Sequence, residues 1–290
     1  MKHIKSTVLI LAAGAMWGMI GLFSTPLNEA GIPFLSMICF RSVLTALLLA
    51  AVIAVKDKKL FRVAWKDLWM FFGMGVLSFV LFNLWYFISM RENESLAVAA
   101  VLLYTAPVFI MLASLLLFRE KLTAVKAVAL ILSVSGCVLV SQPGGASFHA
   151  KGILFGVLSG FGYALYSIFG RYALQKYHSL TCSFYAFFMA SLVTLPVFFC
   201  SGNIGQVFAV QTLPYILGIS VISTFLPYIC YTAGLKLTTP ARASILACIE
   251  PVVAAAAGLA VYGQKLSAGA VMGIVMVLAS VAVLQVKKEA

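Results

Sequence analysis

The sequence predicts an all-α integral membrane protein in which ten transmembrane helices form two inverted-topology five-helix repeats. The first observation behind this fold class is the composition. Of the 290 residues, 63% are hydrophobic and 10% are charged, whereas a soluble domain carries about 25% charged residues. The second is the number of apolar segments long enough to cross a bilayer, and the third is a similarity between the two halves of the chain.

The apolar segments have the length of about 20 residues that a helix needs to cross a bilayer. Charged, polar or Gly/Pro-containing stretches separate them. The segments cover residues 6–27, 33–55, 67–90, 96–118, 124–141, 152–175, 179–200, 213–235, 240–262 and 266–286. Ten crossings return the chain to the side on which it started, so both termini are expected on the same side of the membrane.

Lysine and arginine lie mainly on one side of this topology. With a cytoplasmic N-terminus, sixteen of the 20 lie at the cytoplasmic side and three lie outside, namely Arg91, Lys151 and Lys265. This bias follows the positive-inside rule and predicts a multi-pass protein of the plasma membrane with both termini in the cytoplasm. It accounts for the net charge of +12 without a nucleic-acid partner. The basic connection 55–67 is expected to rest on anionic membrane lipid.

Residues 94–124 resemble residues 238–268 at a constant offset of 144, and Pro107 matches Pro251 in this alignment. Because each half holds an odd number of helices, the second copy enters the membrane from the opposite side. Inverted repeats of this kind are typical of secondary transporters. We therefore divide the chain into a first five-helix repeat, 1–141, an outer linker, 142–150, and a second five-helix repeat, 151–290.

One carboxylate, that of Glu250, interrupts the apolar run 245–262. At 1.5 Å per residue it lies about 15 Å from the cytoplasmic helix end, close to the midplane. A charge at that depth should face the bundle interior or a wet cavity. Pro251 follows it and kinks the helix by removing the hydrogen bond to the carbonyl of Ala247, and Pro107 is the equivalent kink. Glu250 either binds a proton, a substrate ammonium or both, or it satisfies neighbouring donors and only stabilises the kink.

Arg41 is the other intramembrane charge, about 10 Å from the outer end of its helix; the remaining charges lie near the ends of the predicted spans. Three roles are open for Arg41: an ion pair with Glu250, a bidentate hydrogen bond to a substrate carboxylate, or hydrogen bonds to helix-end carbonyls. The ion pair is favoured because intramembrane charges usually pair with one another. Aromatic residues near the midplane form an amphipathic box with Asn83, unless they only fill helix interfaces. The residues expected to line the cavity are Trp17, Tyr104 and Tyr163.

Other site chemistries find little support in the sequence. The six cysteines include no C-x-x-C pair, and the three histidines lie at the N-terminus or between apolar segments, so no metal site and no cofactor is expected. A membrane-embedded enzyme would need constellations of His, Asp or Ser/Lys within the spans, and a sensor would need a large soluble domain or signalling tail. The chain is therefore not expected to be an enzyme.

Four stretches resemble the motifs of one family, in the right order and on the right helices. They are AMWG (15–18), CFRSVLTALLL (39–49), YTAPVFIMLASLLLFREKLT (104–123) and SILACIEPVVAAAAGLAVYGQKLS (244–267). Over essentially the whole chain they are similar to the ten-helix EamA-type branch of the drug/metabolite transporter superfamily. The sequence departs from the family pattern where Gln264 replaces the carboxylate that Glu120 supplies in the first repeat. A helix-end pair made by this carboxylate would therefore exist on the inner side only.

The resemblance implies export or exchange of small metabolites, often amino acids or related compounds, by alternating access. We expect a secondary transporter whose partners are a small-molecule substrate, membrane lipid and, as a candidate coupling ion, protons. One chain completes the pathway, so a monomer is expected. The alternative substrates, lipid-linked or phosphorylated metabolites, would require more cationic groups along the path than Arg41 supplies. Uniport and exchange fit the sequence as well as proton coupling does.

Overall fold

The computed structural model describes residues 2–141, 149–200, 209–263 and 265–286, and all regular structure in these ranges is helical. As predicted, ten spans in this part of the chain are long and apolar enough to cross a membrane. The spans are His3–Glu29, Phe34–Lys56, Trp65–Glu92, Leu96–Leu117, Ala124–Ser141, Ala150–Lys176, Ser179–Phe199, Leu213–Leu235, Pro240–Tyr262 and Ala268–Gln285. Most of the predicted linker, 142–150, lies outside the described residues, and its boundaries stay a prediction.

Five of the ten spans consist of more than one helical segment. In chain order the segments are α1 (Lys2–Gly18), α2 (Ile20–Glu29), α3 (Phe34–Lys56), η1 (Lys58–Phe61), η2 (Trp65–Asp67), α4 (Leu68–Phe72), η3 (Gly73–Val80), α5 (Leu81–Glu92), α6 (Leu96–Leu103), α7 (Ala106–Leu117), α8 (Ala124–Ser141), α9 (Ala150–Lys176), α10 (Ser179–Cys200), α12 (Leu213–Ser220), η4 (Val221–Phe225), α13 (Leu226–Leu235), α14 (Pro240–Ala247), α15 (Glu250–Tyr262) and α16 (Ala268–Val286). The segments η3 and η4 are π-helical.

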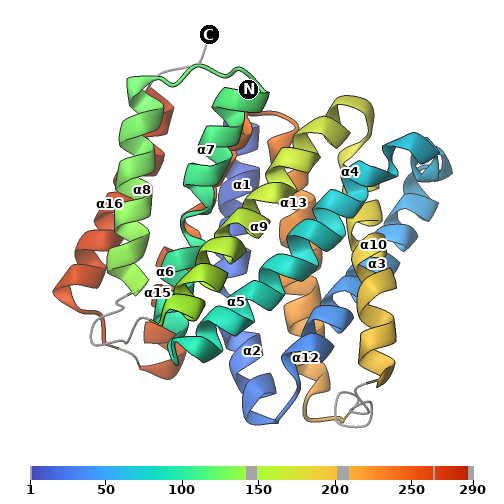
Figure 1. Cartoon of the computed structure of the whole chain (residues 1–290), viewed down its shortest axis with the longest axis horizontal. Helices are drawn as coiled ribbons and strands as arrows, with labels where there is room; N and C mark the ends of the chain where they lie inside the picture. The colour runs from blue at the N-terminus through green and yellow to red at the C-terminus, as the bar shows by residue number, and fades with distance from the viewer. Residues whose placement is uncertain (1, 142–148, 201–208, 264, 287–290) are drawn as a thin grey trace.

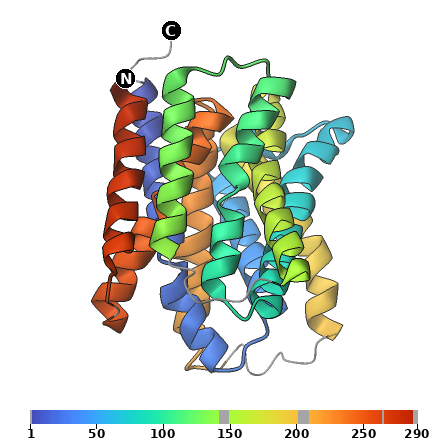
Figure 2. The ribbon, with the colours of Figure 1, turned by 60° about the vertical axis from the view of Figure 1, so that its left-hand side comes forward.

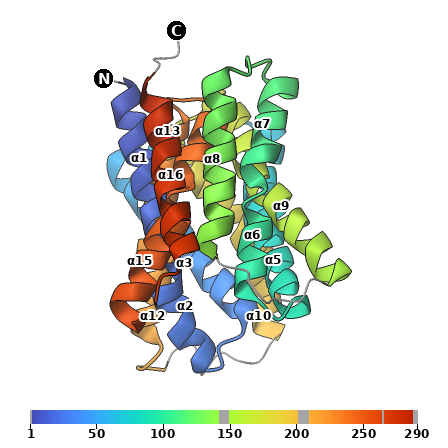
Figure 3. The same ribbon diagram turned by 90° about the vertical axis from the view of Figure 1, so that its left-hand side faces the viewer.

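The two repeats meet through equivalent helices. The offset of 144 relates α8 to α16 and α3 to α10, and each of these pairs packs side by side, at opposite edges of the bundle (Figure 1). Between the edges lie α1, α9, α13 and the two broken spans α6–α7 and α14–α15 (Figures 1 and 3). This arrangement is that of two halves related by a pseudo-two-fold axis in the membrane plane.

The first helix begins and the last helix ends at the same end of the bundle (Figure 2). We call this end the basal end and the opposite end the distal end. The chain direction then places α7 and α14 in the basal half of the bundle and α6 and α15 in the distal half. Figure 3 shows this for α7, α6 and α15. This assignment of halves positions the site described below.

The connection between the second and third spans is tied to the second repeat at the basal end. The carboxylate of Asp67 accepts hydrogen bonds from Lys176 Nζ at 2.7 Å and from the Tyr177 hydroxyl at 2.6 Å. Burial and this bond to Asp67 raise the pKa of Tyr177 above its usual value. The Tyr177 hydroxyl also accepts a hydrogen bond from the backbone amide of Ala64. The next residue, Trp65, is 87% exposed. The connection is therefore held against the bundle with an aromatic side chain projecting from it, as in a membrane-interface anchor.

Glycines set the close approach of α8 and α16. A Cβ atom added to Gly136 would lie 2.8 Å from the carbonyl oxygen of Gly273, and one added to Gly273 would lie 2.6 Å from that of Gly136. Real Cβ atoms do not approach oxygen so closely, so the two backbones touch where only hydrogen atoms fit. Small residues at such crossings give membrane helices the contact area that holds them together.

We expect Gly273→Ala to lower the melting temperature of the purified protein in detergent. The added methyl group overpacks the crossing, at a cost of about 1–3 kcal/mol. Gly269 on the same helix is the matched control, because a Cβ there meets only Ser267 Oγ, at 3.6 Å. Equal melting temperatures for Gly273→Ala and Gly269→Ala would contradict the close backbone contact between α8 and α16 at Gly273.

Candidate functional site

The fourth and ninth spans are each broken near their middle, at equivalent positions. Helix α6 ends before Tyr104 and α7 follows from Ala106, whereas α14 ends before Cys248 and α15 follows from Glu250. A proline stands in the first turn of α7 and of α15, as the sequence predicts. Proline lacks the amide that a continuous helix requires, so each span stops and restarts at mid-depth. Two helix C-termini and two N-termini, with unpaired backbone groups, therefore meet inside the bundle.

Glu250 is the first residue of α15, where its carboxylate lies at the positive end of the helix dipole. The side chain is half-buried, and no described hydrogen bond or ion pair in the placed part of the chain engages it. The equivalent residue of the first repeat is Ala106, so only one of the two breaks carries a charge. An intramembrane carboxylate with free acceptor atoms is available to a proton or to a cationic group of a solute.

A small hollow lies against this carboxylate. Its walls are the two helix breaks and one residue of α9, Tyr163, with Tyr104 and Ser244 supplying hydroxyl groups. Its cavity volume is about 20 Å³, which is room for about one water molecule. Side chains must therefore move before a metabolite fits.

A second hollow, with a cavity volume of about 10 Å³, adjoins the first through Tyr163 and is mostly aromatic. Trp17, 6% exposed, lies at its centre, with ring centroids 6.1 Å from Tyr163 and 5.3 Å from Tyr228. Two further wall tyrosines have satisfied hydroxyls: Tyr166 bonds Thr232 Oγ1 at 2.8 Å, and Tyr231 bonds Ser167 Oγ at 2.7 Å. These two tyrosines pack the core. In the described part of the chain, the hydroxyls of Tyr104 and Tyr163 take part in no such bond.

Arg41 is 6% exposed and is held by both π-helical segments. Its Nε donates to Thr224 Oγ1 in η4 at 2.9 Å, and its guanidinium lies over the ring of Phe79 in η3, 5.3 Å from the centroid. Its Nη1 donates to Asn83 Oδ1 at 3.4 Å. The π-helical turns leave carbonyls for side chains to satisfy: Thr224 donates to Ile219 O at 2.8 Å, and Asn83 donates to Phe79 O at 2.7 Å. Local π-helix is frequent at functional sites.

In this conformation no direct ion pair joins Arg41 and Glu250 among the described residues, and Arg41 donates to Thr224 and Asn83 instead. The two charges still attract each other electrostatically, so their pairing stays a prediction. Asn83 therefore positions Arg41 and does not line either hollow. The sequence analysis did not single out Thr224, whose partner lies 183 residues away along the chain, and no sequence pattern could have identified it.

The predicted residues Glu250, Tyr104 and Tyr163 meet in one hollow, and Trp17 reaches the second. Their roles in transport stay predictions. Ten spans in two inverted halves, with a charged residue at a helix break near mid-depth, define the class of secondary membrane transporters.

The chain belongs to the EamA-like transporter family, whose model matches residues 4–142 and again residues 150–286. A transporter from Archaeoglobus fulgidus that is called uncharacterized is 28% identical over 279 residues, 95% of this chain and 96% of the relative. The inner membrane transporter YicL of Salmonella typhimurium, also called uncharacterized, is 24% identical, and the two chains overlap by 96% and 94%. A crystal structure of another protein superposes with a TM-score of 0.79 at 15% identity, over 96% of each chain, which supports the fold alone.

We expect Thr224→Val to lower the melting temperature of the protein. The change keeps the side-chain shape but leaves the Nε–H of Arg41 without its acceptor, and a bond to a charged group contributes about 1.5–3 kcal/mol. Thr25→Val, at a half-buried position of α2 with no described side-chain hydrogen bond, is the control and should change stability little. If Thr224→Val and Thr25→Val have the same melting temperature, the hydrogen bond from Arg41 to Thr224 does not stabilise the protein.

Proposed function

We propose that this protein is an exporter that carries small organic metabolites, amino acids or related and aromatic compounds, by alternating access through the central hollows. The observation that carries the proposal is the half-buried carboxylate of Glu250, which lies at the break of α14–α15 and borders a hollow lined by both repeats. A solute bound there contacts both halves. It would therefore be exposed to one side or the other as the halves move against each other.

The chemistry of the hollows supports a solute with a cationic group and an apolar or aromatic body. Glu250 would accept an ammonium group, while Trp17 and Tyr163 offer ring faces to the body. The free hydroxyls of Tyr104 and Tyr163 add donors that fix the orientation of a bound solute. Rotation of Tyr163 would join the two hollows, and further side-chain movement would then make room for a metabolite.

The proposed orientation of the protein in the membrane rests on the distribution of its lysines and arginines. The basal end carries most lysines and arginines of the chain, and the positive-inside rule assigns such an end to the cytoplasm. Both termini are then cytoplasmic, the protein resides in the plasma membrane, and export runs from the basal to the distal end. Each chain holds both repeats of the pathway, so the proposed working unit is the monomer.

The rival substrates are less well matched to the site. Lipid-linked or phosphorylated metabolites carry several negative charges, which Glu250 repels, and Arg41 already donates to Thr224 and Asn83. We therefore favour cationic or zwitterionic solutes. The membership of a transporter family supports the view that the chain is not an enzyme.

Replacing Glu250 by Gln is expected to abolish the accumulation of the solute outside the cell. Cells producing the wild type and cells producing equal amounts of Glu250→Gln are compared by mass spectrometry of their medium. A compound enriched with the wild type should fall about ten-fold or more, because the variant loses a charge-assisted contact of about 1.5–3 kcal/mol. Glu29→Gln, at an exposed residue at the distal end of α2, controls for the substitution itself. Equal enrichment from all three proteins would leave Glu250 as the residue of a structural kink.

Proton coupling through Glu250 is tested separately in proteoliposomes. An imposed pH gradient should accelerate solute flux through the wild type, with measurable proton movement in the opposite direction, because one carboxylate binds either a proton or the cationic solute. Flux through Glu250→Gln, where it persists, should ignore the gradient. Wild-type flux that also ignores the gradient, without proton movement, would exclude this coupling and leave uniport or solute exchange.

A further inference from the structure

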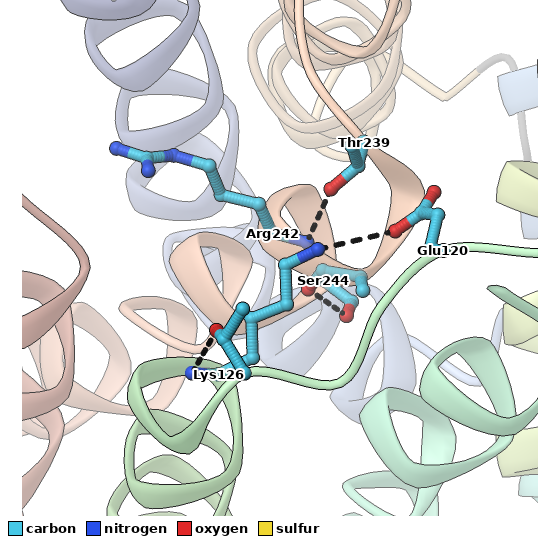
Figure 4. Close-up of polar contacts among 7 residues, drawn as sticks. Glu120, Lys126, Thr239, Arg242 and Ser244 are labelled. Carbon is cyan, nitrogen blue, oxygen red and sulfur yellow. Dashed lines mark hydrogen bonds and ion pairs between the residues drawn. The ribbon is translucent and has the colours of Figure 1, made fainter. Parts of the chain in front are cut away.

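Buried and exposed cations occur together at the basal end. The buried ones have polar partners in the protein: Lys126 Nζ lies 3.4 Å from Glu120 Oε2, and Arg242 Nη2 donates to Gln285 Oε1 at 3.2 Å. Figure 4 shows Glu120, Lys126 and Arg242 beside the first turn of α14. A group of exposed cations lies instead on the connection between the second and third spans, which we call the basal connection (residues 56–67). These cations are Lys56, Lys58, Lys59, Arg62 and Lys66.

The positive charge of the basal connection is not balanced by carboxylates. Among the residues that the structure describes, the ion pairs found include none of these five cations. Of the two carboxylates in the connection, that of Asp57 accepts the backbone amide of Lys59 at 2.9 Å, and that of Asp67 is buried and lies 2.7 Å from Lys176 Nζ. The equivalent connection of the second repeat, 201–212, contains no lysine or arginine. The duplicated frame therefore does not require this charge.

Two of the cations project from the same side of a tight turn. The segment η1 is a 3₁₀ turn over Lys58–Phe61, and the amide of Arg62 donates to the carbonyl of Lys59 at 3.0 Å. Side chains three residues apart eclipse each other in such a turn, so Lys59 and Arg62 lie side by side. An ammonium next to a guanidinium matches a phosphate group, because the guanidinium donates two parallel hydrogen bonds to its oxygens.

Hydrogen bonds from the second repeat fix the backbone of the basal connection. Thr181 Oγ1 donates to Leu60 O at 2.8 Å, and the Tyr185 hydroxyl donates to Phe61 O at 2.7 Å. The contacts of Asp67 described above hold its far end. Charges that only set the topology need no fixed backbone. Here they lie on an ordered surface, and a partner that binds to such a surface loses less free energy to ordering.

Aromatic side chains place the basal connection at the membrane surface. Trp65 is 87% exposed, and Trp69, four residues further on, is 51% exposed. Phe72, the last residue of α4, is 44% exposed. Exposed tryptophans of membrane proteins lie at the level of the lipid headgroups. The cations are therefore at the depth of the lipid phosphates, and Figure 1 shows the connection and α4 at the margin of the bundle, where lipid surrounds the protein.

We propose that the basal connection is a binding site for an anionic phospholipid. Its phosphate is bound by Lys58, Lys59 and Arg62, and an acyl chain lies along the exposed rings of Trp69 and Phe72. A soluble phosphate has the same oxygens but no acyl chain to cover these rings, so the surface is assigned to lipid. The connection belongs to the first repeat and its hydrogen-bond partners to the second. A lipid bound there therefore stabilises a contact between the repeats.

Lipid binding is measured on the full-length protein purified in a mild detergent. Phosphatidylglycerol and neutral phosphatidylcholine with the same acyl chains are titrated separately, while native mass spectrometry counts bound lipid and the melting temperature is followed. We expect phosphatidylglycerol alone to raise the melting temperature. The triple variant Lys58→Gln, Lys59→Gln, Arg62→Gln should bind it on the order of 100-fold more weakly, because each cation near a membrane surface contributes about five-fold. Without added lipid this variant should melt as the wild type does, since the three side chains are exposed.

A second triple variant, Lys5→Gln, Arg119→Gln, Lys121→Gln, is the matched control. It removes the same charge from exposed positions at the basal end, and it should bind phosphatidylglycerol as the wild type does. Tyr177→Phe keeps every cation but removes the hydroxyl that bonds Asp67 and Ala64. It should weaken phosphatidylglycerol binding as well, because the cations then lie on a less ordered backbone.

Equal losses in the two triple variants would overturn the site, because total charge alone would then attract the lipid. Equal binding of the two lipids by the wild type would overturn it as well. So would an equal rise in melting temperature with glycerol phosphate, which has the phosphate but no acyl chains. The measurement needs no transported solute. Its failure would leave the proposed export untouched, and failure of the efflux comparison with Glu250→Gln would leave the lipid site untouched.

Discussion

Every backbone amide and carbonyl within a bilayer must find its hydrogen-bond partner inside the protein, and the rest of this structure depends on how that constraint is met. Continuous helices such as α3, α9 and α10 meet it by themselves. The breaks of α6–α7 and α14–α15 and the π-helical segments η3 and η4 do not, and all four face the interior. Side chains bond some of the backbone groups that these irregular segments leave without a helical partner. The Thr224 hydroxyl, for example, donates to the carbonyl of Ile219. The carboxylate of Glu250 and the hydroxyls of Tyr104 and Tyr163, which make no hydrogen bond within the described residues, keep the interior polar.

Duplication explains why these irregularities occur in pairs, and divergence explains why they differ in chemistry. The two broken spans have the same geometry, with a proline in the first turn after each break. One break carries Glu250 and the other carries Ala106, so the charge at the centre is single. A symmetric frame gives two conformations of similar energy, and asymmetric side chains decide between them.

Much of the fold could be read from the sequence because its signals are local. Apolar length predicted the ten spans, and Pro107 and Pro251 predicted kinks where the structure has two helix breaks. The candidate site was predicted in part: Glu250, Tyr104 and Tyr163 do share one hollow. The direct ion pair of Arg41 with Glu250, which the sequence favoured, is not formed in this conformation, because two intramembrane charges at similar depth need not face each other. Rotation about each helix axis and the register between helices set that contact, and neither can be read from depth alone.

The sequence by itself determined the membrane fold, its internal duplication and the placement of one carboxylate before a proline at mid-depth, because hydropathy, repeat spacing and proline chemistry act within one segment. Only the tertiary structure decided that Arg41 binds Thr224 and Asn83 and that α14 packs on α7. It also decided that the hydroxyls of Tyr166 and Tyr231 are bonded, whereas those of Tyr104 and Tyr163 make no hydrogen bond within the described residues. These contacts join residues far apart along the chain. A duplicated sequence is compatible with such a helix contact at either end of the bundle, and the packing of α14 on α7 lies at the basal end.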